Sequence, residues 1–150
     1  VVAGLAAGAL LYAATRIAVP VLSRWQRFRR HVLAMYGRQG TLSLTAALLL
    51  SLALSVPGEE LFWRGLFQGE LASALDGRTA LAAVLTWTLF VLVNLPSGNL
   101  AAVAAAVVGG AVWVGLAWWT GGVLAALSCH VVWTGLMISL PVVAVPSRTG

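Results

Sequence analysis

Five long apolar stretches alternate with short polar segments along the chain. They cover residues 1–22, 41–56, 79–95, 100–119 and 121–140. Each is long enough, or nearly so, to cross a hydrocarbon core of about 30 Å as a helix that rises about 1.5 Å per residue. Residues 57–75 predict a further helix, or the kinked second half of a long one, because Pro57 suits a first helical turn and Asp76-Gly77 a stop. We therefore expect an all-α, multi-pass transmembrane bundle of about five to six helices.

Composition and charge agree with a membrane protein. Of the 150 residues, 61% are hydrophobic and only 9% are charged, whereas about one quarter of the residues are charged in soluble domains. The net charge is +5, and five of the nine arginines lie in the connector between the first two apolar stretches: Arg24, Arg27, Arg29, Arg30 and Arg38. This clustering follows the positive-inside rule, places the connector on the cytoplasmic side and argues against a nucleic-acid partner. We predict a multi-pass protein of the cell membrane that is surrounded by the lipid bilayer.

The length favours one domain, residues 1–150. The first residues carry neither a starting methionine nor a basic segment, so they are not interpreted as a signal peptide. We expect the chain to begin part-way through a longer protein. Cys129 is the only cysteine, so no disulfide is expected within the chain, and it is interpreted as a small packing residue.

Two smaller features bear on helix packing and on membrane position. Gly4 and Gly8 form a GxxxG pattern, and so do Gly65 and Gly69. The pattern permits two helices to approach closely, although it is common by chance in a chain rich in Gly and Ala. Trp118 and Trp119 end the fourth apolar stretch, which is typical of an aromatic belt at a membrane interface.

The segment VPGEELFWRG, residues 56–65, puts three charges inside this apolar chain. A charge at membrane depth costs several kcal/mol unless it is paired or hydrated, so its presence is informative. On a helix, Glu60 and Arg64 are four residues apart with the acid first, which is the better orientation for an ion pair. Glu59 then remains as the freer carboxylate, suited to general base chemistry.

Two later helices carry polar residues with helical spacing. Thr86, Phe90 and Asn94 follow one another at intervals of four residues, as do His130 and Thr134. Polar side chains in such helices face the bundle interior, so a glutamate, an amide and an imidazole could meet in one polar cavity. The residues alone leave an alternative open, in which Glu60–Arg64 is a structural ion pair and Asn94 and His130 join helices by hydrogen bonds.

These motifs resemble the CPBP family of intramembrane endopeptidases, which unites CAAX prenyl protease 2 with bacterial bacteriocin-processing (Abi) proteins. EELFWRG matches the EExxxR motif of that family, FVLVN stands where it has FxxxH, and HVVWT stands where it has HxxxN or HxxxD. The resemblance covers roughly residues 45–140. It implies hydrolysis of a peptide bond within or at the edge of the membrane, in a membrane-associated protein or peptide substrate.

The resemblance also implies roles for individual residues. Glu59 corresponds to the base that activates a water, Glu60 and Arg64 to the structural pair, and His130 to a donor that stabilises the oxyanion. Asn94 stands where the family has a histidine, and Thr134 where it has Asn or Asp. The family is often called a metalloprotease, but one Glu pair and one histidine fall short of three zinc ligands. We therefore expect no metal or other cofactor.

Three functions remain in competition. The first is an active peptidase that uses Glu59, with Asn94 and His130 as polar partners. The second is an inactive family member that serves as a membrane binding or scaffold protein, and the third is an element of a transporter or channel.

A straight second span starting inside would carry Glu59 toward the far side, whereas a short, tilted or re-entrant one would keep its cavity open to the cytoplasm.

Overall fold

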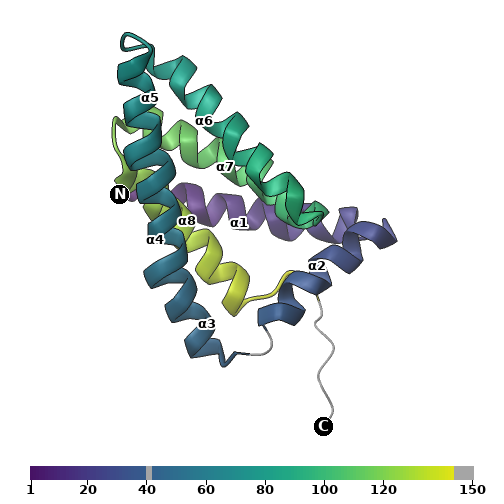
Figure 1. The fold of residues 1–150 in the computed structure, drawn as a ribbon. Helices are drawn as coiled ribbons and strands as arrows, with labels where there is room; N and C mark the ends of the chain where they lie inside the picture. The colour runs from purple at the N-terminus through teal and green to yellow at the C-terminus, as the bar shows by residue number, and fades with distance from the viewer. Residues whose placement is uncertain (40–41, 144–150) are drawn as a thin grey trace.

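The computed structural model describes residues 1–39 and 42–143, and within these ranges the chain folds into helices without strands (Figure 1). The α-helices are α1 (Val2–Leu22), α2 (Gln26–Gln39), α3 (Leu44–Leu50), α4 (Val56–Glu60), α5 (Gln68–Ala74), α6 (Thr79–Asn94), α7 (Leu100–Thr120) and α8 (Val123–Ser139). Two π-helical segments, η1 (Ser51–Ser55) and η2 (Leu61–Phe67), and a 3₁₀ turn, η3 (Leu95–Ser97), complete the order. The predicted all-α fold is confirmed.

Four helical runs in the described part of the chain are long and apolar enough to cross a membrane. They are Val2–Leu22, Leu44–Ala74, Thr79–Ser97 and Leu100–Thr120. The fifth apolar helix, Val123–Ser139, is shorter, with 17 residues. The prediction of a multi-pass helical membrane protein is therefore confirmed.

Residues 44–74 form one helical run, which corresponds to the kinked long helix that the sequence allowed. Ser43 caps its start, because the Ser43 hydroxyl accepts a hydrogen bond from the Ala46 N–H at 3.1 Å. Pro57 stands in the first turn of α4 and has no N–H to donate, and the wider π-helical turn of η1 lies directly before α4. A second π-helical segment, η2, begins directly after Glu60. Single π-helical turns inside α-helices are frequent at functional sites, so this run is a place to look for one.

The connector with the arginines contains helix α2, which the sequence analysis did not predict. Phe28 and Val32 form its buried face, and the Tyr36 hydroxyl donates to the Met137 carbonyl at the end of α8 at 3.2 Å. On the other side, His31 Nδ1 accepts a hydrogen bond from the Leu100 N–H at 2.8 Å. Helix α2 is therefore fastened both to the start of α7 and to the end of α8.

Helices α1 and α8 pack closely along their length, and the GxxxG pattern lies in their contact. A Cβ atom at Gly8 would lie 2.6 Å from the Cys129 carbonyl oxygen and 2.8 Å from Val132 Cβ. Gly4 is similarly close to the Ala125 backbone. Because only glycine leaves room for this approach, the prediction of a close helix contact at Gly4 and Gly8 is confirmed. The same prediction is wrong for Gly65 and Gly69, where an added Cβ would meet no described atom outside its own helical run within 4 Å.

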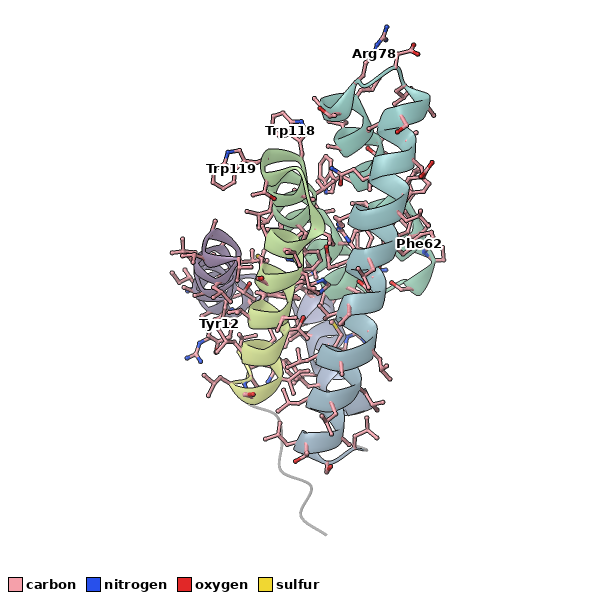
Figure 2. All side chains as sticks on the ribbon, turned by 90° about the vertical axis from the view of Figure 1, so that its left-hand side faces the viewer. Tyr12, Phe62, Arg78, Trp118 and Trp119 are labelled. Carbon is pink, nitrogen blue, oxygen red and sulfur yellow. The ribbon has the colours of Figure 1, made fainter. Side chains whose placement is uncertain are left out.

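The two ends of the bundle differ in character. Trp118 and Trp119 are exposed, and Figure 2 places them at the same end as Arg78 in the turn between α5 and α6. Helix α2 lies at the opposite end, against the turn between α6 and α7. The two tryptophans therefore lie at the end of the bundle opposite the arginine connector, and their place in an aromatic belt stays a prediction.

Candidate active site

Glu60 lies at the centre of the polar cluster in the bundle. Its side chain is fully buried, and Oε1 contacts two partners, Arg64 Nη1 at 3.2 Å and His130 Nδ1 at 2.8 Å. The first contact is the i, i+4 pair that the spacing predicts. The second joins residues 70 positions apart in the sequence and ties the long helix to α8. A buried carboxylate needs such partners, since leaving a charge unpaired in the interior is strongly unfavourable.

The guanidinium of Arg64 lies against two aromatic rings. Its guanidinium carbon lies 4.4 Å from the centre of the Phe90 ring and 5.5 Å from the centre of the Trp113 ring. Cation–π contacts of this kind stabilise a cation that has been removed from water. Phe90 is buried on α6 and Trp113 on α7. The contacts of Arg64 therefore link the long helical run to both α6 and α7.

Two contacts fix the position of the His130 ring. Its ring is stacked on Trp113, with 3.6 Å between the ring centres and 13° between the planes. Its Nδ1 faces Glu60. With Glu60 ionised, the Nδ1–H of His130 donates a hydrogen bond to Glu60 Oε1. Nε2 then has a proton to donate only when the imidazole is doubly protonated. Glu60 thus decides which chemistry the free nitrogen of His130 can perform.

Glu59 is placed differently from its neighbour. Its side chain is exposed at the surface of the protein, and no hydrogen bond joins it to another side chain of the described residues. It nevertheless lies within electrostatic range of His130 and Arg64. Glu59 is therefore the more exposed carboxylate of the pair, whereas Glu60 is fully buried.

Asn94 and Thr134 do not join this cluster by hydrogen bonds within the described residues. The Asn94 Nδ2 donates to the Phe90 carbonyl one turn back on α6, at 2.8 Å. Asn94 is half-buried at the end of α6, one turn from the Phe90 ring that contacts Arg64. Thr134 lies one turn after His130 and lines a separate apolar cavity. The structure thus joins Glu60, Arg64 and His130 directly and leaves Asn94 and Thr134 at the edge.

The sequence analysis missed the aromatic part of the site. Trp113 is buried on α7 and contacts both His130 and Arg64. It stands in an apolar stretch with no polar neighbour to mark it. Phe90 was noted only as the middle residue of a polar stripe. An aromatic residue in an apolar helix gives no signal of its own in a single sequence.

The donor set does not fit a zinc ion. Within the described ranges, no three His, Cys, Asp or Glu side chains gather in a way that could hold a metal. The Oε1 of Glu60 is already engaged by Arg64 and His130.

The family described as "Type II CAAX prenyl endopeptidase Rce1-like" matches residues 41–136. No curated protein matches the chain, and no solved structure does. The matched region contains Glu59, Glu60, Arg64, Asn94 and His130, and it extends over well more than half of the sequence. The prediction from the three motifs is confirmed: the chain belongs to the Rce1-like type II CAAX prenyl endopeptidase family.

Proposed function

We propose that this protein is an intramembrane endopeptidase that hydrolyses a peptide bond of a membrane-associated protein. Glu59 would activate the attacking water. The observation that supports the proposal most directly is that the two adjacent glutamates differ in burial and in partners. Glu60 is fully buried and held by Arg64 and His130, whereas Glu59 is exposed beside these charges.

The charges of the cluster support this chemistry. Two carboxylates, Glu59 and Glu60, stand beside one guanidinium, Arg64, and one imidazole, His130. If the imidazole is doubly protonated, the charges of Arg64 and His130 balance those of Glu59 and Glu60, and buried Glu60 has two cationic partners. The same protonation makes Nε2 a hydrogen-bond donor, as stabilisation of an oxyanion requires.

The reaction then runs in two proton transfers. Glu59 accepts a proton from a water while the water oxygen attacks the scissile carbonyl carbon. The His130 imidazolium donates a hydrogen bond to the oxyanion that forms. When the C–N bond breaks, Glu59 passes the proton to the leaving nitrogen, so the products are a carboxylic acid and an amine, and the acid then loses its proton to the solvent.

The test uses protein purified in detergent micelles with a farnesylated peptide that ends in a CAAX sequence. A second membrane-proximal peptide without the prenyl group is assayed in parallel. We expect Glu59→Gln to lower kcat at least a hundredfold, since general base catalysis contributes about 10²–10⁴-fold. Wild-type cleavage in H₂¹⁸O should place one ¹⁸O atom in the new carboxylate. Glu70→Gln is the matched control, because Glu70 is an exposed glutamate further along the same helical run.

Full activity of Glu59→Gln would exclude Glu59 as the base. Wild-type protein that cleaves neither peptide, although its thermal melting shows that it is folded, would oppose the proposal as a whole.

A second function, that of an inactive family member which binds a membrane partner, is favoured by Asn94. The family has a histidine at this position in the motif, and the Asn94 amide hydrogen-bonds to its own helix. An amide cannot take up a proton as an imidazole does. If this second function holds, wild-type protein cleaves no peptide and Asn94→His gains activity. If the peptidase proposal holds, wild-type protein is active and Asn94→His changes its pH profile.

A further inference from the structure

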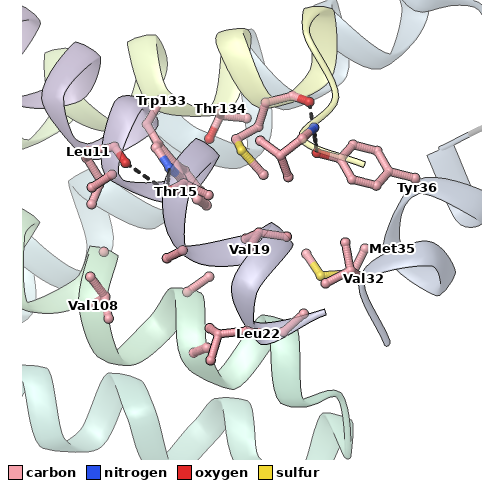
Figure 3. Close-up of a pocket in the computed structure, with 18 of the residues that line it drawn as sticks. Leu11, Thr15, Val19, Leu22, Val32, Met35, Tyr36, Val108, Trp133 and Thr134 are labelled. Atoms are coloured by element: carbon pink, nitrogen blue, oxygen red, sulfur yellow. Dashed lines mark hydrogen bonds between the residues drawn. The ribbon is translucent and has the colours of Figure 1, made fainter. Parts of the chain in front are cut away.

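An apolar cavity of about 240 Å³ lies beside the polar cluster and opens between α1, α2, α7 and α8 (Figure 3). Glu59, Glu60, Asn94 and His130 do not line it. Trp133 is the wall between the two regions, because it lines the cavity and its ring centre lies 5.7 Å from that of Trp113. The cavity is therefore distinct from the candidate active site.

Polar groups at the cavity wall are mostly occupied within the protein. The Thr15 hydroxyl donates to the Leu11 carbonyl at 2.7 Å and accepts from Trp133 Nε1 at 3.1 Å. The Tyr36 hydroxyl is bonded to the backbone at the end of α8. Thr134 contributes one further hydroxyl, and the remaining lining is apolar. A water needs two to four polar partners, so this cavity is suited to hydrocarbon rather than to water or a peptide backbone.

The cavity extends along the C-terminal half of α1. Its lining on α1 extends from Leu11 to Leu22, the last residue of that helix. Eleven steps of about 1.5 Å give about 16 Å, close to half of a hydrocarbon core of roughly 30 Å. Phe28, in the first turn of α2, also lines the cavity, so the cavity extends to the start of the arginine-bearing helix α2.

Four exposed arginines stand at that end. Arg24 lies in the turn after α1, and Arg27, Arg29 and Arg30 lie in the first turns of α2. They flank Phe28, whose side chain is buried against the cavity. The four described acidic residues all lie elsewhere in the sequence, between positions 59 and 76. Clusters of arginine next to transmembrane helices attract anionic lipid headgroups.

We propose that this cavity is a binding site for an anionic phospholipid, which places one acyl chain between α1, α7 and α8 and its headgroup on the arginines of α2. This site does not require that the protein hydrolyses peptides. Because Trp133 separates the cavity from Trp113, the bound acyl chain packs behind the aromatic support of His130.

The test is native mass spectrometry of the delipidated protein with added dioleoyl phosphatidylglycerol or dioleoyl phosphatidylcholine. We expect one phosphatidylglycerol to be retained per chain, at least tenfold more strongly than phosphatidylcholine. Ala18→Phe fills the cavity from α1 and should reduce retention at least tenfold. Ala53→Phe is the matched control at an exposed position on the long helix, and it should leave retention unchanged. If Ala18→Phe melts below the wild-type temperature, Ala14→Phe, also in the lining, replaces it.

The charge arm removes three arginines together, as Arg27→Gln, Arg29→Gln and Arg30→Gln. This variant should retain the two lipids equally, whereas Arg78→Gln at the other end of the bundle should keep the preference. Equal retention of both lipids by the wild type would overturn the proposal, and so would unchanged retention by the filled cavity. A dimer that excludes lipid, or retention of a farnesylated peptide but not of phosphatidylglycerol, would assign the cavity to a second copy or to a substrate and overturn it as well.

Discussion

Glu60→Ala tests the central claim about how the polar cluster is held together. The change removes a carboxylate that is fully buried and that contacts Arg64 at 3.2 Å and His130 at 2.8 Å. The guanidinium of Arg64 is then left among aromatic rings without its counter-charge. Breaking a buried pair by removing one partner costs about 3–5 kcal/mol. At about 2–4 °C per kcal/mol for a chain of this size, the midpoint of thermal unfolding should fall by roughly 6–20 °C.

The assay is thermal melting in detergent micelles, followed by intrinsic tryptophan fluorescence, because Trp113 is stacked on His130 inside the cluster. Glu70→Ala serves as the control for the loss of an exposed glutamate on the same helical run, and it should shift the midpoint by no more than about 2 °C. Glu59→Gln should behave like this control, since the Glu59 side chain is exposed.

A double variant separates the ion pair from simple packing. Replacing both partners of a buried pair with apolar residues is often nearly neutral. We expect Glu60→Leu with Arg64→Leu to melt above either single variant. If Glu60→Ala melts with the wild type, or if the double variant loses the sum of the two single losses, Glu60 and Arg64 do not stabilise each other and the reasoning is refuted.

Three further predictions concern other parts of the structure. Gly8→Ala should destabilise the protein by about 1–3 kcal/mol in the same melting assay, because its Cβ would lie 2.6 Å from the Cys129 carbonyl oxygen. Gly115→Ala is the control: its Cβ would meet no atom within 4 Å, so the change should be neutral or stabilising. Tyr36→Phe should cost about 1 kcal/mol at neutral pH through its lost hydrogen bond to the Met137 carbonyl. Burial raises the pKa of Tyr36 above 10.0, so the wild type should lose stability as the pH rises from about 10 through this raised pKa, and Tyr36→Phe should lose less. A wild-type melting temperature that is flat across that range, or a Gly8→Ala protein as stable as the Gly115→Ala protein, would contradict these expectations.

The elements that the sequence predicted well are those whose signal is local. Apolar stretches longer than a bilayer crossing mark the helices, and a spacing of four residues marks the Glu60–Arg64 pair. Helix α2 was missed because its arginines dominate the composition of that segment. Its buried residues, Phe28 and Val32, are four residues apart and were the available signal.

The contacts that complete the candidate site could not be predicted in the same way. His130 meets Glu60 because α8 packs directly against the α3, η1, α4 and η2 segments of the long helix. That packing joins residues far apart in the sequence, so it leaves no local pattern to predict it from. The stacking of Trp113 on His130 has no local signal at all, since a tryptophan in an apolar helix is usually a packing residue. The catalytic roles of Glu59, Asn94 and His130 stay predictions.

The length of the helical run from Leu44 to Ala74 has a consequence for the membrane around the protein. Its 31 residues correspond to about 46 Å at about 1.5 Å per residue, well beyond a hydrocarbon core of roughly 30 Å, so the run must tilt or extend past the core. Glu59 stands near its midpoint, where tilting changes the depth of the carboxylate least, so its distance from the water interface follows the thickness of the bilayer. Hydrophobic mismatch becomes a physical control on the site, because a change in bilayer thickness moves Glu59 relative to the water interface without changing any contact inside the bundle.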